Sequence, residues 1–305
     1  MCTERHAYLI LAHKNWNQLK KLVELLDDER NDIYIHIDKK SQVGEDTLEA
    51  IRRAVAKSEV CFVDRVEVQW GDYSVVEAEL RLFRAAVPGN YQYFHLISGM
   101  DLPLKSQDEI HAYYKQHSGK EFIQFLDDGW TKKTQTRVKY YWLFQGKLGS
   151  RRERSPLYII QRMLLGVQKL IGVNRCRKYT AKTGAQWISI TRNLAICLCE
   201  NEQLIKKRFA RTFCPDEWVA QTTAIDNGFK DSVYCIQPAD AKSSILRYID
   251  WKRGTPYVFR ASDYDELMES DCLFARKFDE TVDNDIIERI YSRAQKLGGV
   301  PENSD

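Results

Sequence analysis

The chain has 305 residues, which is enough for one large α/β domain or two smaller ones. With 44% hydrophobic and 29% charged residues, its composition is that of an ordinary soluble globular protein, and a net charge of +3 is too small to indicate a nucleic-acid-binding protein. No apolar run reaches the roughly 18 residues of a membrane-spanning helix. No signal peptide precedes the first strand-like segment, and no cysteine pair has C-x-x-C spacing, so we expect a reduced, cytoplasmic protein.

The N-terminal residues predict a parallel strand–helix–strand unit. Ala7–Ala12 is a continuous apolar run of strand length, and Asp32–Asp38 is predicted to form a second strand. Between them, Asn15 fits a helix cap and Leu19–Leu26 recur at helical spacing. Parallel sheets bind ligands beyond the carboxyl ends of their strands, so we expect a ligand near His13 and beyond the second strand.

The α/β pattern continues along the chain. Further strands are predicted at Glu59–Val63, Tyr91–Ile97 and Phe122–Phe125. Ser74 with Glu77 fits a capping box at the start of a helix. We expect a single domain over 1–305, with a nucleotide-binding half at about 1–120 and an acceptor-binding and catalytic half at about 121–290.

Residues 150–178 form a strongly basic segment. Eight basic residues, six of them arginines, are interleaved with apolar clusters such as Ile159-Ile160 and Met163-Leu164-Leu165. The pattern predicts a basic amphipathic helix. Two interpretations follow. Either the apolar stripe packs on the protein's own core under a solvated basic face, or the helix docks on an anionic membrane surface.

The stretch 212–221 carries the strongest candidate for catalysis. Pro215 suits the first position of a helix, and Asp216 and Glu217 then fall in the first turn, where free N–H groups favour carboxylates. The pattern fits a well-capped helix start, and it also fits Glu217 as a general base at a loop-to-helix junction. A helix N-terminus would lower the pKa of Glu217 and weaken it as a base, whereas burial beside Trp218 would offset that effect.

Missing motifs exclude several chemistries. There is no Walker-type phosphate loop, no dinucleotide-binding glycine pattern and no G-x-S-x-G elbow. The pairs Asp263-Tyr-Asp265 and Asp283-Asn-Asp285 have a spacing that can hold a divalent metal. Their polar, helix-like context favours surface carboxylates instead. We therefore expect no metal and no cofactor.

Six short motifs occur in order along residues 7 to about 290: Tyr34-Ile-His-Ile-Asp-Lys-Lys-Ser41, Trp70-Gly-Asp-Tyr-Ser-Val-Val76, Leu96-Ile-Ser-Gly-Met-Asp-Leu-Pro-Leu-Lys105, Gly184-Ala-Gln-Trp187, Cys214-Pro-Asp-Glu217 and Phe274-Ala-Arg-Lys-Phe-Asp279. Each is weak alone, but together they resemble the core-2/I-branching β-1,6-N-acetylglucosaminyltransferase family, which includes peptide xylosyltransferases. The chain looks like a short, unanchored bacterial member. It lacks the anchor and disulfide framework of Golgi members, so their acceptors are not carried over.

The resemblance implies a GT-A-type fold, a Rossmann-like and mostly parallel sheet flanked by helices. It also implies an inverting, metal-independent transfer from a UDP-sugar, with N-acetylglucosamine as the expected sugar, to a glycan hydroxyl in polysaccharide biosynthesis. Glu217 matches the general base and Lys277 the lysine that neutralises the diphosphate. For the family's second basic residue the nearest match is Arg253, with Arg260 as the alternative. Asp38 is the expected uridine contact.

The remaining assignments follow the motifs and strand ends. We place His13 and Trp70 with the UDP-sugar, and Asp101, Trp187 and Trp251 with the acceptor, which is expected to be a glycan or a lipid-linked glycan at the inner face of the cytoplasmic membrane. The chemistry is consistent, because a single inverting displacement needs one base, and a leaving diphosphate needs either a metal or fixed cations.

Two other function classes are alternatives to a glycosyltransferase. One is a catalytically idle protein that binds a nucleotide sugar or a glycan on the same scaffold, which the presence of both Glu217 and Lys277 disfavours. The other is a nucleic-acid binder that uses 151–178, which the lack of aromatic interleaving disfavours. The donor sugar, the acceptor, the linkage and the oligomeric state are left open by the sequence.

Overall fold

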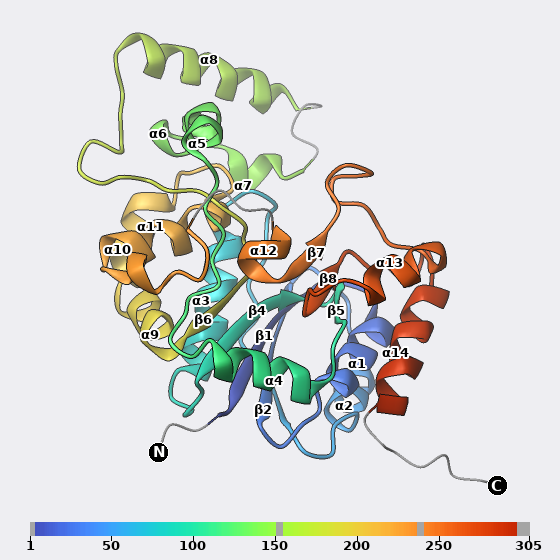
Figure 1. Cartoon of the computed structure of the whole chain (residues 1–305). Coiled ribbons are helices and arrows are strands. Elements are labelled where there is room, and N and C mark those ends of the chain that lie inside the picture. The colour runs from blue at the N-terminus through green and yellow to red at the C-terminus, as the bar shows by residue number, and fades with distance from the viewer. Residues whose placement is uncertain (1–3, 151–154, 237–240, 298–305) are drawn as a thin grey trace, which may run out of the picture.

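A five-stranded sheet forms the centre of the computed structural model, which describes residues 4–150, 155–236 and 241–297 (Figure 1). In spatial order its strands are β3 (Glu59–Phe62), β2 (Asn31–Ile37), β1 (His6–Ala12), β4 (Tyr93–Ser98) and β6 (Ile188–Thr191). The first four are parallel to one another, and β6 runs antiparallel to β4. The predicted α/β class with a mostly parallel sheet flanked by helices is confirmed.

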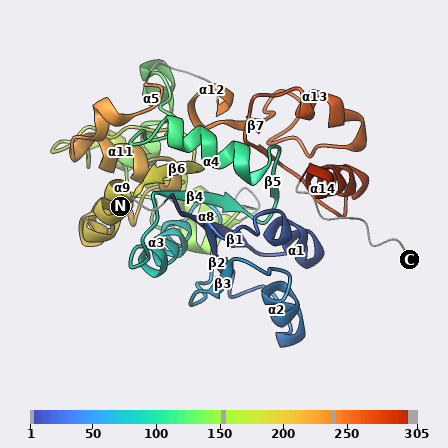
Figure 2. The same ribbon diagram turned by 60° about the horizontal axis from the view of Figure 1, so that its bottom comes forward.

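Side chains of β1 alternate between two hydrophobic cores. Tyr8 and Ile10 pack with α1 (Trp16–Leu25) and α14 (Asp285–Leu297) on one face. Leu9 packs on the other face, where α3 (Ser74–Ala86) and α9 (Arg192–Glu200) lie. Figure 2 shows these two helix pairs at opposite sides of the sheet. Because both faces are covered, β1 is apolar from Ala7 to Ala12, as the sequence indicated.

A small second sheet extends from the end of β4. Its strands lie in the order β5 (Asp101–Pro103), β8 (Phe274–Arg276) and β7 (Arg247–Ile249), with β8 antiparallel to β5 and parallel to β7. The pairing of β8 with β5 brings the motif at 274–279 beside the motif at 96–105. Two segments that are distant in sequence thus meet near the carboxyl ends of β1 and β4.

The remaining elements surround these sheets. They are α2 (Glu45–Arg52), α4 (Gln107–Gln116), α5 (Asp128–Thr134), α6 (Thr136–Lys139), α7 (Gln145–Leu148), α8 (Pro156–Leu170), α10 (Glu202–Phe209), η2 (Pro215–Glu217), α11 (Val219–Asp226), η3 (Phe229–Ser232), α12 (Ala241–Ile245), η4 (Ala261–Asp263) and α13 (Tyr264–Met268). Helices α5 to α8 form an excursion at the top of Figure 1, with α8 farthest from the sheet. In the described part of the chain, no helix has both the length and the apolar character needed to cross a bilayer.

Two local predictions are wrong. Ser74 is the first residue of α3 and not its cap, because its hydroxyl accepts a hydrogen bond from the Gln69 N–H at 2.9 Å. The predicted strand at 122–125 is reduced to an isolated bridge between Phe122 and Ser189. The Ser74 hydroxyl is used by a backbone N–H five residues earlier in the chain, and Phe122 exchanges both of its backbone hydrogen bonds with Ser189 without the pairing continuing to its neighbours.

Candidate active site

Glu217 lies at the end of a short 3-10 turn, Pro215–Glu217, and α11 begins only at Val219. Cys214, the residue before this turn, has a left-handed backbone with φ of 51°. Its N–H donates a hydrogen bond to the Gly71 carbonyl at 2.9 Å. The predicted helix start at Pro215 is therefore a turn. Because Glu217 precedes the α-helix, the helix dipole acts on it less than the sequence suggested.

Two glycines let this turn pack against neighbouring segments. Gly71 has φ of +74°, and a Cβ there would lie 2.8 Å from the Phe213 ring. The N–H of Gly184 donates to the Glu217 carbonyl at 2.9 Å. A Cβ on Gly184 would lie 1.8 Å from the Gln124 carbonyl oxygen. Both positions therefore require glycine, and both belong to motifs that the sequence singled out.

The Glu217 carboxylate is paired and remains reachable. Arg137 of α6 donates from Nη1 to its Oε2 at 2.6 Å, and the Glu217 side chain is 36% exposed. Burial raises the pKa of Glu217 above its ordinary value, and the Arg137 charge opposes that rise. The net shift is upward, which suits a general base. Sequence reasoning missed Arg137, because it lies in a polar, aromatic stretch without a motif.

Two further carboxyl groups gather behind Glu217. Burial and the Glu217 charge raise the pKa of Asp216 to about 7. Glu79 of α3 lines a small cavity with Asp216, and burial, then Asp216, raises its pKa well above the ordinary value. The Gln186 amide donates to Glu79 Oε1 at 2.7 Å. Burial and the neighbouring Asp216 carboxylate therefore favour the protonated form of Glu79.

The carboxyl ends of β1 and β2 form the other end of the candidate site. Asp38 Oδ1 accepts hydrogen bonds from the Lys40 N–H at 3.0 Å and the Val68 N–H at 3.2 Å. The Ser41 hydroxyl donates to the His13 carbonyl at 2.6 Å. The structure thus brings the predicted residues His13 and Asp38 together at the edge where ligands of parallel sheets bind.

Lys277 follows β8 and joins His13 and Lys14 in what we call the basic cluster. Burial lowers the pKa of Lys277, and the neighbouring charges of Arg276 and Lys14 lower it further, whereas Asp279 opposes them. Burial also lowers the pKa of His13, with contributions from Lys14 and Lys277. Basic groups that repel one another in a partly buried place are stabilised by a polyanion.

The loop that carries Lys277 is fastened to the β1–α1 connection. Lys14 Nζ lies 2.6 Å from Asp279 Oδ2. The buried Gln18 amide donates to the Phe278 carbonyl at 3.1 Å. These contacts hold the basic cluster at the end of β1. Nothing in the local sequence pattern indicates that Gln18 binds a segment 260 residues away.

Asp101 and Trp187, predicted to bind the acceptor, both contact Arg276. Asp101 is 1% exposed, accepts a hydrogen bond from the Ser98 hydroxyl at 2.9 Å and lies 3.5 Å from Arg276 Nε. The Arg276 guanidinium lies 3.9 Å from the centre of the Trp187 ring. A direct acceptor contact by Asp101 does not fit this burial; its carboxylate instead positions Arg276. Trp187, at the end of the Gly184–Trp187 segment, links β8 to the Glu217 turn.

Arg253 is engaged by carboxylates. Its guanidinium pairs with Asp250 at 2.5 Å, Asp263 at 2.7 Å and Glu266 at 3.1 Å. In this arrangement its charge is already balanced, which opposes the predicted contact with a diphosphate. Arg260, the alternative, is exposed.

The two remaining predicted residues are exposed aromatic rings. Trp251 lies in the same loop as Arg253, and Trp70 packs edge-on against Phe213 with ring centres 5.6 Å apart. Trp70 follows Val68, which binds Asp38, and precedes Gly71, which binds Cys214 before the Glu217 turn, so along the chain it lies between the two ends of the candidate site.

Neither predicted Asp-x-Asp pair forms a metal site in the described residues, among which no group of three or more His, Cys, Asp or Glu could hold a metal ion. Asp263 pairs with Arg253, and Asp283 Oδ1 accepts a hydrogen bond from the Ile286 N–H at the start of α14 at 3.2 Å. Both carboxylates therefore serve local structure.

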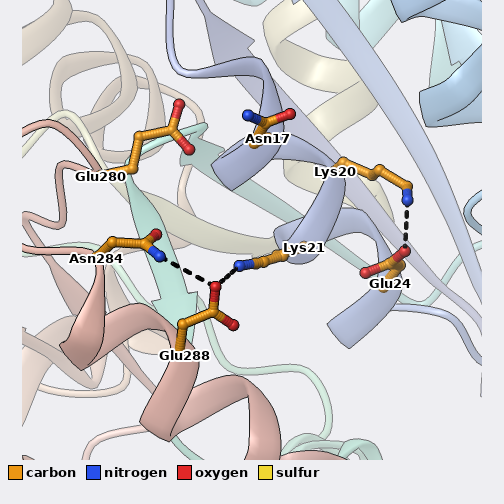
Figure 3. Close-up of a pocket in the computed structure, with 7 residues that line it drawn as sticks. All are labelled: Asn17, Lys20, Lys21, Glu24, Glu280, Asn284 and Glu288. Atoms are coloured by element: carbon orange, nitrogen blue, oxygen red, sulfur yellow. Dashed lines mark hydrogen bonds and ion pairs between the residues drawn. The ribbon is translucent and has the colours of Figure 1, made fainter.

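A hollow of about 460 Å³ lies away from these residues, between α1 and α14 (Figure 3). Glu288 pairs there with Lys21 and accepts a hydrogen bond from the Asn284 amide at 3.0 Å. Lys20 lies 3.4 Å from Glu24. Two pairs of its charged side chains are bound to one another, and Glu280 accepts a hydrogen bond from the Gln18 N–H at 2.9 Å, so each charged side chain that lines this hollow already has a partner.

Comparisons with known proteins agree with the resemblance seen in the sequence. The family model described as Core-2/I-Branching enzyme matches residues 6–269. The chain is 24% identical over 305 residues to the human beta-1,3-galactosyl-O-glycosyl-glycoprotein beta-1,6-N-acetylglucosaminyltransferase, covering 91% of this chain and 66% of that protein. It is 22% identical over 307 residues to human xylosyltransferase 2, covering 93% of this chain and 33% of that protein. The chain therefore spans only part of these relatives.

A solved structure of mouse xyloside xylosyltransferase 1, in its apo form, aligns with a TM-score of 0.37 and 10% sequence identity. The alignment covers 88% of this chain and 96% of the mouse chain. This likeness is too low to carry an argument about individual site residues.

Proposed function

We propose, since the chain belongs to the Core-2/I-Branching enzyme family, that it is an inverting glycosyltransferase that moves a sugar from a UDP-sugar to a hydroxyl of a glycan acceptor. N-acetylglucosamine is the sugar that the name of the human relative supports. The observation that carries the proposal is Glu217, a reachable carboxylate with a raised pKa, held by Arg137 in the segment that the family resemblance marks as catalytic.

Glu217 acts as the general base in this proposal. The acceptor oxygen attacks the anomeric carbon while the bond from that carbon to the diphosphate oxygen breaks, and the hydroxyl proton passes to Glu217. One carboxylate suffices, because a single displacement forms no covalent sugar–enzyme intermediate. Arg137 holds one carboxylate oxygen in place, and the upward pKa shift strengthens Glu217 as a proton acceptor.

The basic cluster stabilises the leaving UDP. The diphosphate gains charge as the glycosidic bond breaks, and fixed cations can stabilise that charge where no metal does so. Lys277 is the main candidate, because Lys14 is already paired with Asp279. Asp38 lies at the end of β2, and we propose that it contacts the uridine. Metal independence is part of the proposal.

A donor scan tests this function. The protein is incubated with UDP-N-acetylglucosamine, UDP-xylose, UDP-glucose and UDP-galactose, and UDP release is measured with and without oligosaccharide acceptors. We expect release from UDP-N-acetylglucosamine, strengthened by a glycan acceptor, and loss of that release in Glu217→Gln. UDP binding without release from any donor or acceptor would instead identify a catalytically idle binding protein.

A further inference from the structure

Helix α8 turns its polar side toward the protein. Gln161 is fully buried, and its side-chain oxygen accepts hydrogen bonds from the N–H groups of Leu143 at 2.8 Å and Phe144 at 3.2 Å. Gln168, two turns later, accepts from the Tyr141 N–H at 2.7 Å and donates back to the Tyr141 carbonyl at 3.1 Å. Two glutamines therefore fasten α8 to the backbone of the segment before α7.

The apolar side of α8 faces away from the protein. Four large side chains at spacings of three or four residues, which we call the outer face, are exposed by 63%, 65%, 52% and 87%: Ile159, Met163, Val167 and Leu170. Of the α8 residues, all of which the structure describes, only Gln161 is buried. The interpretation that this stripe packs on the protein's own core is therefore wrong. Contiguous exposed apolar side chains of this kind mark an interaction surface.

The sequence before and after the outer face is strongly basic. Between Gly129 and Cys199 the sequence has fifteen lysines and arginines and one acidic residue, Glu153. Arg162 and Lys169 lie exposed on α8 itself, and Arg177 and Lys178 lie exposed shortly after it. Three arginines of the segment, at 151, 152 and 154, lie outside the described residues. A surface that is apolar and cationic at once complements a surface that is apolar and anionic.

We propose that the outer face docks on an anionic lipid bilayer, with its apolar side chains among the acyl chains and Arg162 and Lys169 at the level of the headgroups. A helix that lies in the interface buries its apolar face there and places basic residues against anionic lipid. A second copy of the chain fits less well, because like-charged basic segments would face each other. This surface is independent of the proposed chemistry, so its test does not depend on activity.

Vesicle co-sedimentation of the full chain tests the proposal. We expect binding to vesicles of phosphatidylcholine with phosphatidylglycerol to exceed binding to phosphatidylcholine alone, and to weaken as salt is raised. Met163→Gln with Leu170→Gln should reduce binding by roughly tenfold or more, because buried apolar area is lost. The matched control is Leu204→Gln with Val282→Gln, two exposed apolar residues elsewhere, which should leave binding unchanged.

The charges are tested separately. Arg162→Gln with Lys169→Gln should reduce binding to the anionic vesicles by roughly thirtyfold. Arg53→Gln with Lys115→Gln, exposed basic residues directly after α2 and on α4, should leave it unchanged. A thermal unfolding transition at the Tm of the wild type shows that each variant is folded. Equal binding to neutral and anionic vesicles, or an outer-face variant that binds normally, overturns the proposal. So does a dimer in solution that the outer-face variant converts to a monomer, because the occupant is then a second copy.

Discussion

The two ends of the candidate site respond to burial in opposite directions. At the end that holds Glu217, burial raises the pKa values of three carboxyl groups, those of Glu79, Asp216 and Glu217. At the basic cluster, burial lowers the pKa values of His13 and Lys277. The physical cause is the same, because a partly buried place disfavours whichever form is charged.

The partners make the two ends different. At the Glu217 end one cation, Arg137, opposes the rise of the pKa at Glu217 and also at Asp216, whereas at Glu79 the opposing contribution is the hydrogen bond from the Gln186 amide. At the basic cluster Asp279 compensates Lys14 directly and Lys277 only partly. The proposed reaction supplies what would stabilise each end, namely a proton at Glu217 and a diphosphate at Lys277. The following changes break or sharpen that comparison.

Replacing the base should have the largest effect. We expect Glu217→Gln to lower sugar transfer by roughly 10²–10⁴-fold, the usual contribution of a general base, while UDP affinity is unchanged. Steady-state transfer and calorimetric titration with UDP measure the two quantities. Glu269→Gln, on an exposed surface, is the matched control. Turnover near that of the wild type would remove Glu217 from the mechanism.

Removing the main cation should act on the nucleotide. Lys277→Met is expected to weaken UDP binding by roughly 10–100-fold, the contribution of a hydrogen bond to a charged group, and to leave uridine binding nearly unchanged. The reason is that only UDP carries the phosphates. Titrations of both ligands against the variant and against Lys252→Met, an exposed lysine, measure the difference. An equal loss for uridine would mean that Lys277 does not contact the diphosphate.

Removing the partner of the base should shift the pH profile. Arg137 lowers the pKa of Glu217, so Arg137→Gln should raise that pKa further. Because the base must be deprotonated, activity is lost as the pH falls through this pKa, and the acid limb of kcat/KM should move to higher pH by roughly one unit. Profiles of the wild type and the variant measure the shift. A limb that stays in place would show that Arg137 does not act on the base.

The raised pKa of Asp216 should make the stability of the folded protein depend on pH. The pKa of Asp216 is about 7 in the folded protein, above its unfolded value, so the folded state binds the proton more tightly. The resulting stability is present at low pH and is lost as the pH rises toward 7. The variant Asp216→Asn has no group that titrates at this position. The Tm of this variant relative to that of the wild type should therefore rise between about pH 4 and about pH 7. A Tm difference that is independent of pH contradicts a raised pKa.

The smallest expected effect is that of metal removal. If the basic cluster replaces a metal, EDTA should leave transfer unchanged, and added Mn²⁺ should not increase it. Activity with EDTA, with Mn²⁺ and without either compares the three conditions directly. A strict requirement for Mn²⁺ would show that a metal ion, and not Lys277, stabilises the leaving diphosphate.

The parts that the sequence predicted well are those that a local pattern encodes. The apolar run of β1 and the strand predicted at 32–38 are buried parallel strands, and the order of strands and helices predicted that His13 and Asp38 follow the carboxyl ends of β1 and β2. The parts that it missed depend on partners distant in the chain. Arg137 reaches Glu217 from another helix, and the orientation of α8 follows from Gln161 and its contact with the backbone at 143–144. Amphipathic spacing shows that a helix has two faces but does not determine which one turns inward.

The central claim, that Glu217 takes the acceptor proton, is tested most directly by the pH dependence of kcat/KM in the wild type and in Glu217→Gln. The account predicts an acid limb in the wild type with an apparent pKa above the ordinary value of a glutamate, because burial raises the pKa of Glu217. The residual activity of Glu217→Gln should lack this limb. The same limb in the variant would contradict the account, because another group would then be the base.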